Sequence, residues 1–228
     1  MAALSNVLGL FALPGPLNIQ FGMTAVPFLL VALFLGPRWG ALCGLLGGIT
    51  QAQKYGHILY VLYTAIQGGV TGYFAQRARE TRGAAFLFAL GGGFFLFWWI
   101  DLLSASHFEL KSLATSFADA PSVFGTDIFI PFPLYGTLGA TLMVALTWWL
   151  VSKPLHPRGI RHFALAGCFG AVSYVPYDAF VLYWVQGYPW LPTWFVLSKD
   201  LVQDFVAAVL VASIAQNVRV RGMLNSST

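Results

Sequence analysis

Residues 25–44 read AVPFLLVALFLGPRWGALCG, an apolar run interrupted by Gly36-Pro37 and by the single charge of Arg38. A helix formed by such a run has no polar face for water, so it must lie in a protein core or in lipid. The Gly-Pro pair predicts a tight turn between two helices, which we expect at 22–36 and 38–53. Both are short for a helix that crosses a bilayer, which needs about 20 residues.

The composition indicates that the whole chain, like residues 25–44, is too apolar for an ordinary soluble domain. Of its 228 residues 58% are hydrophobic and 9% are charged, whereas roughly a quarter are charged in soluble domains. The formal net charge of +4 comes mainly from short connections between apolar runs, which argues against a nucleic-acid-binding surface. We therefore expect an all-α, polytopic membrane helical bundle, formed as one domain by residues 1–228.

The apolar runs and the basic connections together predict a topology. Two connections, at 77–82 and 153–161, and the final segment with Arg219 and Arg221 are rich in Lys and Arg. We expect all three to face the cytoplasm, because cytoplasmic loops carry an excess of basic residues. This places both termini inside and the connections 14–21 and 105–129 outside. Eight helical segments are expected, at 1–13, 22–36, 38–53, 57–76, 83–104, 130–152, 162–185 and 193–217.

A weak internal repeat relates 82–152 to 158–217. In each half, an Arg-Gly pair opens a helix that carries a lone Asp toward its outer end, Asp101 in one and Asp178 in the other. A parallel helix-pair repeat would place these two acids at comparable depth. Chance recurrence of Arg-Gly and Gly-rich helices explains the pattern equally well.

The last segment carries the clearest functional signal. Lys199, Asp200, Gln203 and Asp204 lie within six positions, followed by an apolar stretch to Ala215. A carboxylate in a membrane helix is costly, so it needs a partner, a wet cavity or a ligand. We expect a polar cavity open to the outside. The alternative is that Lys199 pairs with the acids while the remaining polar groups reach the membrane surface.

Other residues extend this predicted site. Tyr174 belongs to a group of aromatic residues at the outer side of the last two helices, which would suit either a flat ligand or an interfacial belt. The Pro-rich loop at 14–21 would cap the cavity or serve as a plain connector. The substrate-binding candidates are Asn18, Gln20, Asp101, Tyr174, Asp178, Lys199, Gln203 and Asp204.

Several classes of chemistry have no residues to support them. The sequence contains no GxSxG, HExxH or GxxxxGK[ST] motif, so nucleophilic, zinc-dependent and nucleotide-hydrolysing activities are not expected. Its two cysteines both lie in apolar segments, which disfavours a disulfide framework or a thiolate metal site. The prediction is a non-enzymatic chain without a cofactor or metal, and uphill transport would require a partner or an ion gradient.

Residues 25–44 resemble the membrane-embedded substrate-binding (S) components of energy-coupling factor (ECF) transporters. In those proteins a Pro-led apolar run is often followed by Gly-Pro and then Gly-Ala-x-x-Gly, as it is here at Gly36-Pro37 and Gly40–Gly44. The preceding loop and Ser198–Gln203 are also similar to that family, so the resemblance covers about a third of the chain. The family usually has six helices, whereas eight are counted here; either 83–152 contains an added hairpin or the count is too high.

The resemblance implies a vitamin- or precursor-binding subunit in the plasma membrane of a prokaryote. Such a subunit binds its ligand near the outer face and docks on a transmembrane coupling protein driven by two cytoplasmic ATPases. Small residues on the first helix commonly form the docking surface, and here these correspond to Ala2, Ser5 and Gly9. Two alternatives remain: a membrane scaffold or morphogenesis protein of similar fold that binds no solute, and an ion-coupled carrier that uses the acids.

Small residues also recur at four-residue spacing through Gly36, Gly40, Gly44 and Gly48. Such ridges let helices approach closely in lipid. We expect them to pack within the chain, with an interface between subunits as the alternative.

Overall fold

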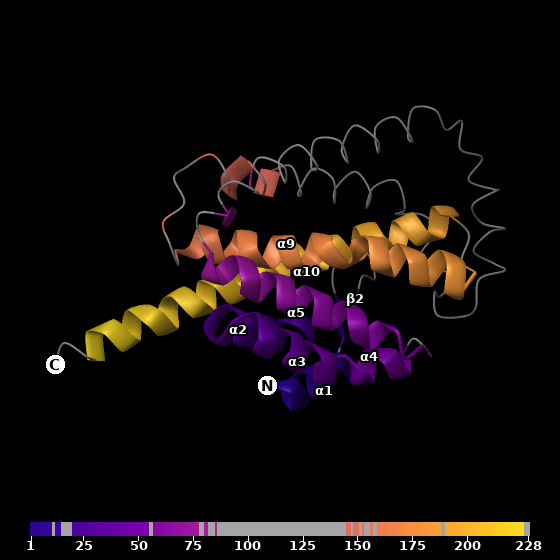
Figure 1. Cartoon of the computed structure of the whole chain (residues 1–228), viewed down its shortest axis with the longest axis horizontal. Coiled ribbons are helices and arrows are strands. Elements are labelled where there is room, and N and C mark those ends of the chain that lie inside the picture. Colours follow the sequence, from indigo (N-terminus) through magenta and orange to yellow (C-terminus); the bar gives the residue numbers. More distant parts are fainter. Residues whose placement is uncertain are drawn as a thin grey trace.

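The computed structural model describes most of the two terminal regions of the chain. The long helix α9 packs against both α5 and the second long helix α10, and the N-terminal helices lie beneath them (Figure 1). The described residues are 1–10, 12–14, 20–54, 57–77, 80–81, 85, 145–146, 148–150, 152, 156, 159–187 and 190–225. The elements are α1 (Ala2–Leu10), β1 (Ala12–Pro14), β2 (Gln20–Gly22), α2 (Ala25–Leu35), α3 (Pro37–Gly47), α4 (Ile49–Lys54), α5 (Tyr60–Gln76), α9 (Ile160–Phe180), the π-helix η3 (Val181–Val185) and α10 (Trp190–Asn225).

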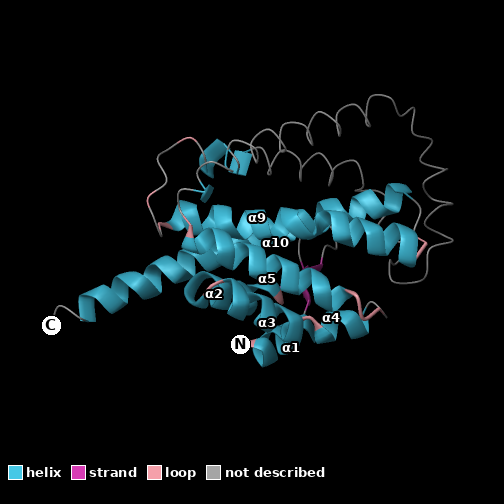
Figure 2. Ribbon diagram, viewed as in Figure 1, coloured by secondary structure: helices cyan, strands magenta, loops and turns pink. Residues whose placement is uncertain are grey.

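The described part is a helical bundle with one short pair of strands (Figure 2). Two helical stretches, Ile160–Val185 and Asp200–Val218, are long and apolar enough to cross a membrane. The predicted segments 83–104 and 130–152 lie largely outside the described residues, as does most of the proposed repeat unit 82–152. The eight-span count therefore stays a prediction.

The first predicted helix is shorter than expected. It ends at Leu10, and Ala12–Pro14 pairs as an antiparallel strand with Gln20–Gly22. The prediction of a helix to residue 13 is wrong because Pro14 disfavours helical backbone at the residue before it. Pro14 pairs with Gln20 at the end of the ladder, so the connection between α1 and α2 is partly an extended ribbon.

The predicted helix 38–53 is divided at Gly48 into α3 and α4. Asn6 of α1 bridges the break, since its Nδ2 donates to the Leu46 carbonyl at 2.8 Å. Its Oδ1 accepts hydrogen bonds from the Thr50 backbone N–H and from the Thr50 hydroxyl, each at 2.9 Å. One side chain thus satisfies a carbonyl at the end of α3 and an N–H at the start of α4, where helices leave such groups unpaired.

Asn6→Ala is expected to lower stability by about 1–2 kcal/mol, because it leaves these helix-terminal groups without partners. For a chain of this size the midpoint of thermal unfolding in detergent should fall by about 3–6 °C. Leu4→Ala, on the exposed face of the same helix, is the matched control and should change the midpoint little. Equal effects of the two substitutions would contradict the bridging role of Asn6.

The glycine ridge of α3 packs within the chain, against α5. A Cβ added at Gly40 would meet the Gly68 carbonyl oxygen, and a Cβ at Gly44 would lie 2.7 Å from the Thr64 carbonyl carbon. The two backbones are therefore in direct contact, and the Thr64 hydroxyl donates to the Gly44 carbonyl at 2.7 Å. Intramolecular packing of the ridge, which the spacing predicted, is confirmed.

The turn between α2 and α3 depends on Gly36, whose φ of +87° favours glycine. Pro37 then begins α3. At this first position of a helix a backbone N–H has no intrahelical partner, so proline, which lacks the N–H, costs no hydrogen bond. The predicted break at Gly36-Pro37 is thus confirmed.

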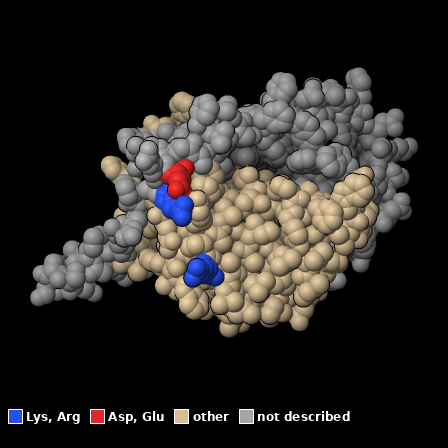
Figure 3. Space-filling model, in the orientation of Figure 1, with Lys and Arg blue, Asp and Glu red and all other residues tan. Residues whose placement is uncertain are grey.

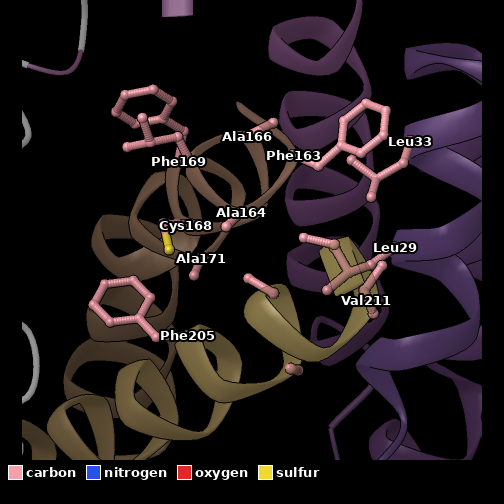
Figure 4. Packing of buried hydrophobic residues seen from close by; sticks show 14 of the residues in the cluster. Leu29, Leu33, Phe163, Ala164, Ala166, Cys168, Phe169, Ala171, Phe205 and Val211 are labelled. Atoms are coloured by element: carbon pink, nitrogen blue, oxygen red, sulfur yellow. The ribbon is translucent and has the colours of Figure 1, made fainter. Parts of the chain in front are cut away.

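The core lies where α2, α9 and α10 meet (Figure 4). Leu29 of α2 and Val211 of α10 point toward each other, and Ala164 of α9 is fully buried in the same cluster. α9 and α10 approach closely because small residues face each other, and a Cβ at Gly167 would lie 2.6 Å from the Ala208 Cβ. This packing holds α9 and α10 side by side. It thereby positions the polar residues of both helices that lie toward the α9–α10 connection.

One end of the bundle collects basic residues. The end of α5 meets the start of α3, where the Gln76 side chain occupies the space a Cβ at Gly36 would need. It also meets the start of α9, where His162 Nε2 lies 3.0 Å from the Phe74 carbonyl oxygen. These contacts bring Arg38, Arg77 and Arg161 to a common basic end. On the face in Figure 3, the charged atoms lie toward one side and most of the described surface is uncharged.

An exposed ion pair also lies at the basic end. Arg77 and Glu80 approach within 3.2 Å. The hydrogen bond to Glu80 raises the pKa of the Arg77 guanidinium, because it stabilises the charged form.

Candidate functional site

The opposite end of the bundle carries a network of tyrosines and acids. Here α9 contains Pro176, which has no backbone N–H to donate, and it continues into the π-helix η3. π-helical turns are rare and are often found at functional sites. The irregular end of α9 presents Tyr174 and Asp178 to the interior of the bundle, where both are buried.

The central contact joins α9 to α10. The Tyr174 hydroxyl donates a 2.7 Å hydrogen bond to Asp204 Oδ2. Tyr174 is 1% exposed and Asp204 is 5% exposed. A carboxylate that receives a short hydrogen bond from a buried hydroxyl is held in one position, so Asp204 faces the interior of the bundle.

Asp178 is the second buried acid, with 4% of its surface exposed. It lies close enough to Asp200 and Asp204 for their negative charges to act unfavourably on its ionised form. Within the described residues, no ion pair or side-chain hydrogen bond reaches the Asp178 carboxylate. Burial of an acid among like charges is unfavourable unless something else compensates it.

Two tyrosines of α5 complete the network. The Tyr63 ring lies 5.0 Å from the Tyr174 ring, centroid to centroid, with a tilt of 53°. Tyr60 packs edge-on against Tyr63, with ring centroids 6.0 Å apart. The Tyr63 hydroxyl donates to Gln51 Oε1 of α4. We call Tyr63, Tyr174, Asp178, Asp200 and Asp204 the acid–tyrosine site.

The hydroxyls of Tyr60 and Tyr177 form hydrogen bonds that connect α5 with the end of α9. The Tyr60 hydroxyl donates to Gln186 Oε1 at 3.1 Å, just beyond η3. The Tyr177 hydroxyl donates to the Leu59 carbonyl oxygen at 3.0 Å. The start of α5 and the end of α9 are thus joined at two points, which orients the acid–tyrosine site between α5, α9 and α10.

Gln67 lies one helical turn along α5 from Tyr63, toward the basic end. It is 1% exposed, and neither its amide nitrogen nor its amide oxygen has a hydrogen-bond partner among the described residues. Its backbone faces Gly170, where a Cβ would lie 2.6 Å from the Gln67 carbonyl oxygen. A buried amide without partners is destabilising by about 1–3 kcal/mol, so it calls for a functional explanation.

The described residues do not include a group of three or more His, Cys, Asp or Glu side chains placed to hold a metal ion. Asp178, Asp200 and Asp204 influence one another electrostatically without converging on a single point.

The structure brings together three of the predicted binding residues, Tyr174, Asp178 and Asp204. Gln203, which precedes Asp204 on α10, is half-buried. Gln20 lies in β2 and Lys199 in α10, but only their backbone is described. Asn18 and Asp101 lie outside the described residues, so their predicted roles stay predictions.

The predicted docking residues of α1 occupy different environments. Ser5 is fully buried against Gly47 of α3, where an added Cβ would lie only 2.7 Å from the Ser5 Cβ. It therefore contributes to packing against α3, and its docking role stays a prediction. Ala2 and Gly9 are half-buried, and their docking role stays a prediction.

Sequence reasoning missed Tyr60, Tyr63 and Gln67. They recur at three- and four-residue spacing within the apolar segment 57–76, which places them near one face of a helix. Polar groups on one face of an apolar helix indicate a buried polar contact, so this spacing was the available signal.

Comparison of the chain with protein-family models, with curated proteins and with solved structures finds no match.

Proposed function

We propose that this chain is a substrate-capture subunit of an ATP-coupled uptake system for a vitamin or a related small water-soluble molecule. The acid–tyrosine site would receive the molecule. The observation that carries the proposal is the burial of Asp178 and Asp204 between two apolar helices. Each carboxylate in a membrane helix costs roughly 2.5–3.5 kcal/mol, and a bound ligand would offset that cost.

The proposal includes a multi-pass topology in a prokaryotic plasma membrane. The basic end formed near Arg38, Arg77 and Arg161 would face the cytoplasm, as the positive-inside rule requires. The acid–tyrosine site would then face outward, where a solute arrives. α10 has 36 residues and spans about 54 Å at 1.5 Å per residue, so its C-terminal part would extend past the bilayer into the cytoplasm.

The energy source would be a partner. The sequence has no phosphate-binding loop for ATP, so the proposal requires a transmembrane coupling subunit with two cytoplasmic ATPases. The resemblance of Gly36–Gly44 to ECF S components supports this assignment. Co-purification of such a complex from the native membrane would test it, and isolation of the chain without ATPases would count against it.

A screen of the purified protein against water-soluble vitamins is expected to find a ligand that stabilises it. A ligand at 100 times its Kd adds about 2.7 kcal/mol, which corresponds to roughly 5–10 °C in the unfolding midpoint. Asp204→Ala should abolish that increase, while Glu80→Gln, which removes an exposed acid at the basic end, should retain it. A ligand response that survives in Asp204→Ala would remove the site assignment, and a screen without any response would favour the scaffold alternative.

One observation favours the ion-coupled carrier as a second candidate. From Tyr63, the buried polar residues Gln67 and Thr71 follow α5 toward His162 at the basic end, and both Gln67 and Thr71 lack side-chain hydrogen bonds among the described residues. Such a row resembles a proton or ion path. Uptake by the chain alone, abolished when ion gradients are collapsed and unaffected by ATP depletion, would establish this alternative.

A further inference from the structure

The charge of the acid–tyrosine site limits which ligands it can hold. Asp178 is buried, the charges of Asp200 and Asp204 act unfavourably on its ionised form, and its carboxylate has no cationic partner among the described residues. An anionic ligand would add to this repulsion in a medium that screens it poorly. A positively charged ligand would relieve it.

The aromatic rings limit the ligand further. Tyr63 and Tyr174 are tilted by 53° with centroids 5.0 Å apart, and the hydroxyl of Tyr174 is directed to Asp204. Tyrosine faces attract cations through the negative potential of the ring, with organic ammonium groups as the best-known ligands. Carboxylates beside such faces are therefore complementary to a cation that also has apolar surface.

Gln67 is an independent indication that the site takes a ligand. It follows Tyr63 by four positions on α5 and lies opposite Gly170, which precedes Tyr174 by four positions on α9. It therefore lies next to the tyrosine pair, one turn toward the basic end. Both polar atoms of its buried amide are without partners, so it can offer a donor and an acceptor to a ligand held by the two rings.

We propose that the ligand is a small organic cation. Its positively charged nitrogen would face Asp178 and Asp204, and its flat body would pack on Tyr63 and Tyr174. This inference rests on the proposed capture function and adds the chemical class of the substrate.

The test uses the full chain in lipid nanodiscs and three ring compounds that differ in charge. These are benzyltrimethylammonium, benzyl alcohol and benzoate, and the readout is the unfolding midpoint as a function of concentration. Benzyltrimethylammonium is expected to raise the midpoint at concentrations at least tenfold lower than either other compound. Asp178→Asn, which keeps the shape and removes the charge, should weaken that response at least tenfold.

Two further variants make the result specific. Asp178→Glu restores the charge and should recover most of the response, whereas Glu80→Gln removes an acid at the opposite end and should leave the response unchanged. If Asp178→Asn and wild type respond equally to the cation, the inference is wrong.

The other outcomes separate this inference from the proposed function. Preferential stabilisation by benzoate or benzyl alcohol would overturn the cationic class and leave solute capture standing. If none of the three compounds acts, the charge of the ligand found in the vitamin screen decides: a cation supports the inference and an anion or neutral molecule overturns it. If that screen also finds no ligand, both proposals fail.

Discussion

Gly44→Ala is expected to destabilise the protein by about 3 kcal/mol or more and to lower its unfolding midpoint by about 10 °C. The added Cβ would lie 2.7 Å from the carbonyl carbon of Thr64 and 3.1 Å from the nitrogen of Ala65. These are backbone atoms of a helix, so they cannot move aside as a flexible side chain would. Overpacking of a core typically costs 1–3 kcal/mol. Because Gly44→Ala forces two helices apart, we expect its cost to lie at or above the upper end of that range.

Gly69→Ala is the matched control, because it makes the same chemical change on the partner helix. Its Cβ would lie 3.4 Å from the Ala41 Cβ, a contact that a small adjustment accommodates. Alanine is also a better helix former by up to about 1 kcal/mol, so the midpoint should stay the same or rise. Similar losses in the two variants would contradict the close α3–α5 contact.

The same pair of variants distinguishes internal packing from an interface between subunits. If the Gly44 ridge served assembly, Gly44→Ala would reduce the mass of the detergent-solubilised particle and leave the stability of each chain unchanged. We expect the opposite, with the loss confined to the unfolding midpoint. Light scattering at the same detergent concentration provides the second measurement.

Tyr174→Phe is expected to have the second largest effect, a loss of about 2 kcal/mol. The substitution removes only the hydroxyl that donates to Asp204 at 2.7 Å. A hydrogen bond to a charged group contributes about 1.5–3 kcal/mol, and a buried acceptor left without its donor is costly. The unfolding midpoint should fall by about 4–8 °C.

A double-mutant cycle identifies the origin of that loss. When Asp204→Leu is combined with Tyr174→Phe, both polar groups are removed, so the double variant should be more stable than the sum of the single losses predicts. Tyr73→Phe is the control, because it deletes a hydroxyl whose hydrogen bond to Arg77 is exposed, and it should be nearly neutral. Strict additivity of the two site variants would show that Tyr174 and Asp204 are not coupled.

The local features of the chain could be predicted where neighbouring residues decide them. The turn at Gly36-Pro37 requires a positive φ and a helix start, which glycine and proline provide without help from distant residues. The close approach of α3 also follows from the four-residue spacing of its glycines. The break at Gly48 was missed because Asn6, from a different helix, satisfies its polar groups.

The site was predictable only in part for the same reason. The spacing of Asp200 and Asp204 places both on one side of α10, and the lone Asp178 marks the same end of α9. Nothing along either segment indicates that Tyr63 of α5 meets Tyr174, or that Gln67 is buried beside them. The predicted loop residues and Lys199 lie where the structure describes no side chain, so their part in the site stays a prediction.

The amino-acid sequence by itself determined that this chain forms apolar helices and that its acids gather toward one end of the last two. Composition and helical periodicity are sufficient for this, because each depends on residues within a few turns of one another. Only the tertiary structure decided that Tyr174 bonds to Asp204, that Tyr63 joins them and that Ser5 is buried in the chain. A helix determines which of its residues share a face, but the neighbour of that face depends on how all the helices pack together.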